Sequence, residues 1–495
     1  MNAGAGQSVS RNVFILSIRQ ILTWSSTFLL LLFLPRYLGP VEYGKLYLGV
    51  SVVTMFALLI DFGGRYSITK EVSRAREDVG QIISDSIGIR ALLWIVSFLA
   101  IIVFSYIARY DTTEKAILLI FGIAMTWSGI RSVLYSCYQG FEILEYPSYG
   151  VVAETIFIAA VGVPALLLGT GAVGFAVIMS LGWLLNFLIC GKFAGHLTKS
   201  LPRINWHSAV ALLKNGLPYF LNSLFGVIYY RIDSVMLSLM TPPSVVGWYG
   251  AAYRFFDALM FVPSIFTISI FPALARGWVN QQDSMGRRFQ RSLDFIVLVG
   301  VPMSIGSFAF SDQVVTLLYG MAGYAPSVLL IKIFSVGLLL VYIDNIFGTT
   351  LLASDKQRIM SMNAFAAIFV NIALNYLFIP YTQAKFGNGG IGSAIATFAT
   401  ELFVMILMIF SLDKKILENS RIHVQLKALA AGCIMGITIW AFAAMGIPWI
   451  GQAILGSGVY CGLLYASNAV SNSDLRLVWE LVPKRFRFAR LGNEG

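Results

Sequence analysis

Two charged residues stand near the middle of a segment that is otherwise apolar enough to cross a bilayer. The segment runs from Gly216 to Met240, and the stretch VIYYRIDSVML places Arg231 and Asp233 within it. A charge at the centre of a membrane helix costs roughly 2.5–3.5 kcal/mol in insertion experiments. Side chains two positions apart on a helix point in different directions, so these charges cannot neutralise each other well. Each therefore needs another partner or water, as in a site that binds a charged ligand or an ion.

The next apolar segment carries a second pair of charges. In the stretch YRFFDALMF, Arg254 and Asp257 stand three positions apart, which places them on one face of a helix. Two antiparallel helices would hold all four charges at comparable depths. One interpretation is a set of ion pairs that only locks the two helices together. The other is a group of charges facing a water-filled cavity, and we favour it because intramembrane charges usually mark functional sites.

The elements that must position these charges are membrane-spanning helices. Of the 495 residues, 58% are hydrophobic and 12% are charged, against soluble averages of about 45–50% and about 25%. A spanning helix needs about 20 mostly apolar residues, and such segments are too long for the strands of a membrane barrel. We predict an all-α polytopic membrane protein with about 14 transmembrane helices. The predicted spans are residues 12–34, 45–64, 89–108, 116–137, 148–168, 173–193, 216–240, 247–272, 293–311, 326–351, 361–381, 390–411, 426–446 and 449–470.

The basic residues predict how the chain is oriented in the membrane. They account for a net charge of +11 and gather in alternate loops between the apolar segments. This is the pattern of cytoplasmic loops, and it does not indicate a surface for nucleic acid. We therefore predict a multi-pass protein of the inner or plasma membrane, in contact with membrane lipids, with both termini cytoplasmic. The sequence shows no metal-ligand cluster, P-loop or nucleotide signature, so we expect neither a metal nor a cofactor.

Internal similarity predicts two halves. The turn GPVEYGKLYLG (39–49) aligns with SVVGWYGAAYR (244–254), and GAVGFAV (171–177) aligns with GGIGSAIA (389–396). Each half would contain six helices, so both halves enter the membrane from the same side as parallel repeats. Transporters built this way place the substrate site between their lobes. We predict an N-terminal lobe over 1–205, a C-terminal lobe over 206–412, and two further helices with a basic cytoplasmic tail over 413–495.

Three stretches resemble a known family: PRYLGPVEYGKLYLG (35–49), DFGGRYSITKEVSR (61–74) and YRIDSVMLSLMTPPSVVGWYGAAYRFFDAL (230–259). The family is that of the bacterial and archaeal polysaccharide flippases, within the multidrug, oligosaccharidyl-lipid and polysaccharide export superfamily. The resemblance implies a transporter, not an enzyme. It would flip polyprenyl-pyrophosphate-linked oligosaccharide from the cytoplasmic to the outer leaflet, by alternating access, for cell-surface polysaccharide biosynthesis.

The resemblance also implies a cationic central cavity for this substrate. By position, Arg19, Arg231 and Arg254 would be the cavity cations that bind the substrate. Asp233 and Asp257 would be their charge partners or the groups that couple transport to H⁺ or Na⁺. Arginine suits the role because its planar donor fork can bind a phosphate through two hydrogen bonds.

Alternatives of two classes stay open. A peptidoglycan-precursor flippase or a cation-coupled multidrug exporter would share the fold. Three arginines against two aspartates favour an anionic substrate over a cationic drug. A membrane-embedded polysaccharide polymerase or ligase would be an enzyme, but the loops between the predicted spans are short for a catalytic site outside the membrane.

Overall fold

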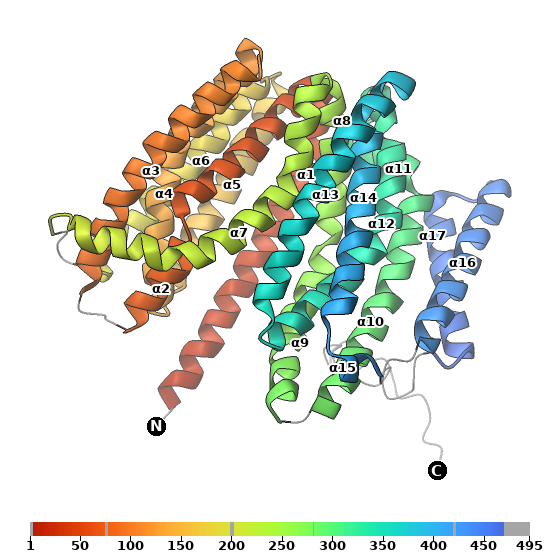
Figure 1. The fold of residues 1–495 in the computed structure, drawn as a ribbon. Coiled ribbons are helices and arrows are strands. Elements are labelled where there is room, and N and C mark those ends of the chain that lie inside the picture. Colours follow the sequence, from red (N-terminus) through yellow and green to blue (C-terminus); the bar gives the residue numbers. More distant parts are fainter. Residues whose placement is uncertain (1–2, 75–77, 199–201, 281, 419–421, 470–495) are drawn as a thin grey trace. The chain divides into compact units, whose positions relative to one another are not determined.

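The structure, a computed structural model, describes residues 3–74, 78–198, 202–280, 282–418 and 422–469. Most side chains before Phe33, and those of residues 222, 279–280 and 282–284, are outside this description. Every regular element in the described ranges is a helix (Figure 1). The first part of the chain forms α1 (Ala3–Asp61), α2 (Gly64–Arg74), α3 (Val79–Ile107), α4 (Thr112–Gly140), α5 (Glu145–Leu167), α6 (Ala172–Lys192) and the 3₁₀ turn η2 (Ala194–His196). The remainder forms α7 (Trp206–Met240), α8 (Pro243–Leu259), α9 (Phe261–Asn280), α10 (Gln282–Ala309), α11 (Ser311–Leu318), α12 (Met321–Ala353), α13 (Gln357–Phe386), α14 (Gly389–Ser411), α15 (Lys414–Glu418), α16 (His423–Ala444) and α17 (Trp449–Ala466).

The helices confirm the predicted fold class. Within the described residues, 12 segments are long and apolar enough to cross a membrane. The two other predicted spans, 12–34 and 449–470, fall on the first part of α1 and on α17. The spans predicted at 12–34 and 45–64 are joined into α1 across a kink at Gly39, whose φ of 71° lies in the left-handed region. Glycine adopts this conformation without a Cβ clash, and the neighbouring Pro40 has no N–H to continue the helical ladder.

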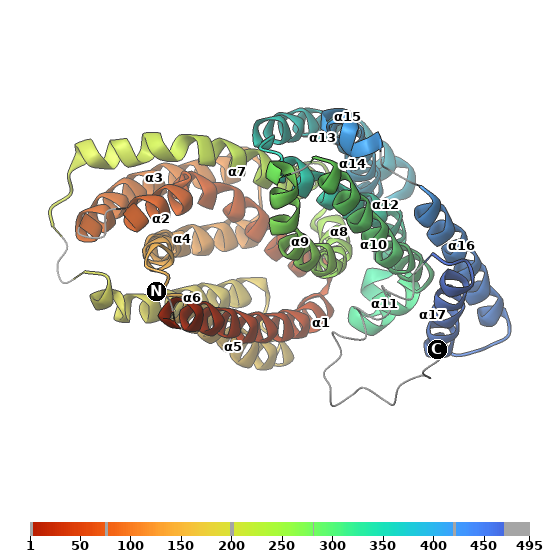
Figure 2. The same cartoon turned by 90° about the horizontal axis from the view of Figure 1, so that it is seen from below.

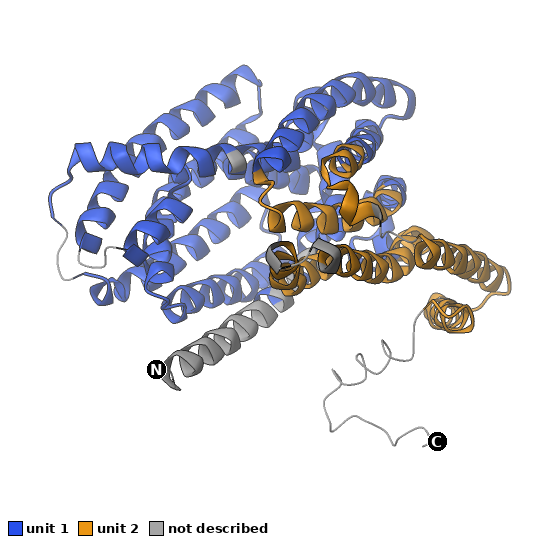
Figure 3. Cartoon of the chain, turned by 60° about the horizontal axis from the view of Figure 1, so that its bottom comes forward, with its two compact units in different colours: residues 1–258, 314–333, 358–404 blue, residues 259–313, 334–357, 405–495 orange. Residues whose placement is uncertain are grey.

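The described contacts divide the chain into two compact units (Figure 3). Unit 1 comprises residues 1–258, 314–333 and 358–404, and unit 2 comprises residues 259–313, 334–357 and 405–495. Three of the boundaries fall well inside helices, in α11, α12 and α14, so the units follow contacts and not the order of the sequence. The lobes predicted over 1–205, 206–412 and 413–495 stay a prediction.

In unit 1, α1 packs against α4, α5 and α7, while the first half of α7 runs along α2 and α3 (Figure 2). The start of α4 is tied to α1 by an ion pair of 2.7 Å between Lys45 Nζ and Asp111. Partial burial raises the pKa of Asp111, but hydrogen bonds from the Glu114 N–H and from Lys45 outweigh it and leave this pKa below its usual value. In unit 2, α10 packs against α9 and α16, and α16 packs against α17.

Candidate substrate cavity and buried carboxylate

A cavity of about 130 Å³ lies in unit 1 among α1, α5, α6, α7 and α8. Its charged lining residues are Arg231 on α7 and Arg254 on α8. The remaining lining side chains are largely apolar: Leu30, Leu34, Pro35, Tyr43, Leu46, Tyr47, Val50, Ile158, Phe175 and Met179. A water molecule occupies about 30 Å³ of liquid volume, so the cavity has room for about four waters. Two arginines therefore contribute to the lining of a small and otherwise largely apolar cavity.

The two arginines share their surroundings with one carboxylate. Both are half-buried, and Asp257, one helical turn after Arg254, is attracted electrostatically to both guanidinium groups. Tyr47 of α1 lines the same cavity beside Arg231, and Ser234 lies close to Tyr47. Two positive charges against one negative charge leave this group net positive, which suits an anionic ligand.

Glycines bring α1 and α8 close enough for this arrangement. A Cβ at Gly44 would collide with the carbonyl oxygen of Pro243, and one at Gly247 would collide with that of Pro40. A Cβ at Gly250 would lie 2.7 Å from the ring of Tyr47. Only glycine allows such close backbone approach. The glycine-containing turns that predicted the repeat are therefore the places where the two helices touch.

Asp233 is directed away from the two arginines into a separate polar cluster. Its side chain is 3% exposed. It accepts hydrogen bonds from the Tyr249 hydroxyl at 3.0 Å, the Asn375 amide at 2.7 Å and the Thr397 hydroxyl at 2.8 Å. Asn375 also donates to Asn371 Oδ1 at 2.9 Å. Asp233 is thus held by neutral donors from α8, α13 and α14, as buried polar groups require.

Two other membrane carboxylates in unit 1 have partners. Glu154 on α5 forms an ion pair of 2.9 Å with Arg131 on α4 and accepts a hydrogen bond of 2.5 Å from Asn186 on α6. Glu401 on α14 accepts a hydrogen bond of 2.5 Å from the Tyr229 hydroxyl. These contacts fasten neighbouring helices together.

The structure brings together some of the predicted site residues and separates others. Arg231 and Arg254 meet at one cavity with Asp257 nearby, whereas Asp233 lies in its own cluster. Arg19 lies on α1, but its side chain is outside the described residues. The partners of Asp233 were not predicted from the sequence. The stretch NIALNYL contains a signal for them, because Asn371 and Asn375 stand four positions apart on one face of an apolar helix.

A bundle of membrane-length helices with a charged cavity is the architecture of a membrane transporter. The chain belongs to the family described as polysaccharide biosynthesis protein, whose model matches residues 9–278. This match confirms the family that the turn sequences predicted.

Similar proteins have been named as flippases. The probable low-salt glycan biosynthesis flippase Agl15 of Haloferax volcanii is 24% identical over 394 residues, which cover 79% of this chain and 80% of that protein. The probable lipid II flippase MurJ of Helicobacter pylori strain 26695 is 27% identical over 317 residues, covering 61% of this chain and 64% of that protein. A solved structure of lipid II flippase MurJ in an inward closed conformation has a TM-score of 0.72 at 15% identity, covering 91% of this chain and 97% of that one. This likeness shows a shared fold.

Proposed function

We propose that this protein flips polyprenyl-pyrophosphate-linked oligosaccharide from the cytoplasmic to the outer leaflet of the inner or plasma membrane, for cell-surface polysaccharide biosynthesis. The observation that carries the proposal is the pair of guanidinium groups, Arg231 and Arg254, at a cavity among membrane helices. Arginine binds phosphate oxygens through two parallel hydrogen bonds, and it keeps its charge at any physiological pH. The family and the relative named for glycan biosynthesis support the glycan as cargo.

Transport of such a substrate requires a wider conformation than the present one. Cavities that enclose drug-sized ligands measure about 300–1,000 Å³, and this cavity measures about 130 Å³. In the proposed orientation, the contact of Gly44 with Pro243 and Gly247 lies on the outer side, next to the kink in α1 and at the beginning of α8. We propose that this contact closes the outer side, and that its opening is a step of alternating access.

Asp233 is our candidate for the coupling site. Its carboxylate stands beside the hydroxyl oxygens of Thr397 and Tyr249 and beside two amide groups. In the described residues, the Asn375 Oδ1 atom has no hydrogen-bond partner. Hard cations prefer oxygen ligands of these kinds. The cluster can therefore take up Na⁺, or the carboxylate can take up H⁺, when the helices around it rearrange.

The second candidate is a flippase for a peptidoglycan precursor. The similarity to a probable lipid II flippase favours it, and a lipid-borne pyrophosphate would suit the same two arginines. A multidrug exporter is less consistent with two guanidinium groups against one carboxylate at the cavity. A polymerase or ligase has no support from relatives, which are named as flippases.

The test is complementation of a strain that lacks the protein, with wild type, Arg231→Ala and Arg231→Lys. We expect wild type to restore surface polysaccharide. Arg231→Ala should leave the lipid-linked oligosaccharide on the cytoplasmic side, with flipping reduced on the order of 100-fold if the lost hydrogen bonds to a charged group contribute about 3 kcal/mol. Arg231→Lys keeps the charge without the planar fork and should be intermediate. Normal surface polysaccharide in the deletion strain, with peptidoglycan precursor accumulating instead, would establish the second candidate.

A further inference from the structure

A second polar concavity lies in unit 1, between α2 and the first half of α7. Its volume is about 570 Å³. Its charged lining residues are Lys70 and Arg74 on α2, Lys214 on α7, and Glu71, so three positive charges face one negative charge and the net charge is +2. We call it the α2–α7 groove. It shares no lining residue with the cavity of Arg231 and Arg254.

The basic side chains of the groove are available to a ligand. Lys70, Arg74 and Lys214 are exposed, and among the described residues none of them takes part in an ion pair. The wall between them is formed in part by Tyr219, whose ring stacks on that of Tyr66 at a centroid distance of 5.5 Å. A polar groove with an aromatic side chain in its wall can accommodate the polar headgroup of a lipid.

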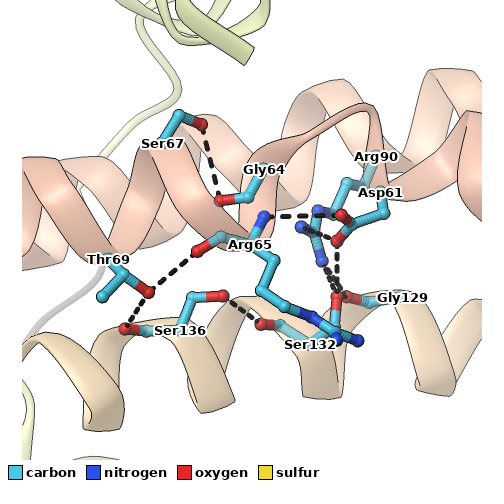
Figure 4. Close-up of polar contacts among 9 residues, drawn as sticks. All are labelled: Asp61, Gly64, Arg65, Ser67, Thr69, Arg90, Gly129, Ser132 and Ser136. Carbon is cyan, nitrogen blue, oxygen red and sulfur yellow. Dashed lines mark hydrogen bonds and ion pairs between the residues drawn. The ribbon is translucent and has the colours of Figure 1, made fainter. Parts of the chain in front are cut away.

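The α2 side of the groove is fixed by a turn between α1 and α2 (Figure 4). Arg90 on α3 is 3% exposed and pairs with Asp61 Oδ1 at 2.8 Å. Arg90 also donates to the carbonyl oxygen of Gly129 at 2.6 Å and to Ser132. One turn along α2, the Thr69 hydroxyl donates to the carbonyl oxygen of Ser136 on α4 at 3.1 Å. The position of α2 therefore rests on buried contacts with α3 and α4.

The α7 side is fixed at two points. The Gly216 backbone lies so close to the turn before α2 that a Cβ there would be 2.5 Å from the carbonyl oxygen of Phe62, and the rings of Phe62 and Phe220 stack with their centroids 4.2 Å apart. At the beginning of the helix, Asp85 on α3 accepts hydrogen bonds from the Asn205 N–H at 2.7 Å and from Ser208. Both walls are thus held before any ligand binds, which lowers the entropy cost of binding.

We propose that the α2–α7 groove binds the pyrophosphate headgroup of the lipid-linked substrate at the cytoplasmic surface, before the substrate reaches the central cavity. The inference rests on the proposed function and orientation. A pyrophosphate diester carries one negative charge on each phosphorus, which matches the groove's net charge of +2. The groove volume lies in the range of pockets that enclose small ligands, about 300–1,000 Å³. A common phospholipid such as phosphatidylglycerol has a single negative charge, so it would neutralise only half of the groove's net charge of +2.

The test measures lipid binding to the full-length protein by native mass spectrometry. The protein is released from neutral detergent after incubation with undecaprenyl-pyrophosphate-linked N-acetylglucosamine, which is a pyrophosphate diester, with phosphatidylglycerol or with uncharged undecaprenol. The groove variant is Lys70→Gln/Arg74→Gln/Lys214→Gln. The matched control replaces three exposed basic residues of unit 2, Arg276→Gln/Lys414→Gln/Lys415→Gln. Arg231→Ala serves as the variant of the central cavity.

We expect wild type to bind two molecules of the pyrophosphate diester, and the groove variant and Arg231→Ala to bind one each. The groove variant should lose affinity by at least about tenfold, because each basic residue near a charged surface contributes about 1 kcal/mol. The control should bind as wild type does. Unchanged binding by the groove variant would overturn the inference. The inference would also be overturned if phosphatidylglycerol bound wild type as tightly as the pyrophosphate lipid does and lost as much affinity in the groove variant. The groove would then be a general binding surface for anionic lipids.

The design separates a failure of this inference from a failure of the proposed function. Lipid binding in the groove is measured without transport, whereas the proposed function is tested by complementation with Arg231 variants. The groove substitutions lie on exposed side chains, so the variant should fold. Gel filtration of the variant checks its folding. Each of the three single substitutions should lose less affinity than the triple variant, which provides a second check.

Discussion

Arg231 and Asp233 are close in the sequence but contact different neighbours. Arg231 lines the cavity beside Tyr47 of α1, while Asp233 is enclosed by donors from α8, α13 and α14. Side chains two positions apart on a helix point in different directions, which explains why the two residues contact different neighbours. One helix can therefore supply a substrate site on one side and a coupling site on another.

We predict that Asp233→Asn abolishes the dependence of transport on a Na⁺ or H⁺ gradient. The amide keeps the shape of the side chain but cannot attract a cation or take up a proton. Thr397→Ala removes one hydrogen bond from the same cluster, and Asp257→Asn removes the other candidate carboxylate. The measurement is flipping in proteoliposomes with and without each gradient.

We expect Asp257→Asn to keep the gradient dependence and Thr397→Ala to weaken it. The amide at position 233 also faces three donors, so a loss of about 1–3 kcal/mol in stability is expected, and a thermal unfolding curve measures it. Asp233→Asn protein that is folded and still responds to the gradient would rule out Asp233 as the coupling group.

The sequence could identify which residues are unusual but not all of their neighbours. Charges in an apolar segment are visible from composition, and the three-residue spacing of Arg254 and Asp257 predicts a shared face. Two of the three partners of Asp233, Asn375 and Thr397, come from helices more than a hundred residues later in the chain. Such long-range pairing depends on how the helices pack, which one sequence does not reveal.

At the scale of elements, the α1–α8 contact depends on glycines at its centre. Gly44 and Gly247 let the two backbones touch, and Gly250 leaves room for the ring of Tyr47. A contact made by backbone atoms is all-or-none, because one added methyl group prevents it. This property suits an interface that closes in one conformation and separates in another.

We predict that Gly44→Ala shifts the protein toward a conformation open on the outer side. The added Cβ collides with the carbonyl oxygen of Pro243 when the contact is closed. The measurement is the rate at which a membrane-impermeant thiol reagent labels an introduced Leu46→Cys, a buried residue of the cavity lining. The background carries Cys433→Ser and Cys461→Ser, because these two cysteines are exposed.

We expect labelling from outside to become several-fold faster in Gly44→Ala. The matched control is Gly191→Ala on α6, where an added Cβ meets nothing within 4 Å. Equal labelling in both variants would mean that the α1–α8 contact does not close the outer side.

The sequence predicted the long apolar helices well but not the shorter elements around them. The predicted spans fall on helices, since about 20 apolar residues in a row leave few alternatives in a membrane. The spans 12–34 and 45–64 share α1, however, and the span 247–272 is divided between α8 and α9. The spans did not include α2, α11, α15 or the beginning of α7, which are short or polar. The walls of the α2–α7 groove are among these missed elements, so the groove could not be predicted from the spans alone.

At the scale of the whole molecule, the distribution of basic residues determines what each site can do. The net charge of +11 is concentrated in loops on one side of the predicted topology. The predicted topology would place the α2–α7 groove on that side and the α1–α8 contact on the other. Substrate made in the cytoplasm would thus meet the groove first and the closed outer contact last.

We predict that both termini are cytoplasmic, and fusions to reporters test this. Green fluorescent protein after residue 495 should fluoresce, because it folds in the cytoplasm. Alkaline phosphatase inserted after Gly169, in the turn between α5 and α6, should be active because that turn should lie outside. The same insertion after Asp355, between α12 and α13, is the matched control and should be inactive. The reversed pattern would place the groove outside the cell, where it could not receive a substrate made in the cytoplasm, while the cavity of Arg231 and Arg254 would still favour an anionic cargo.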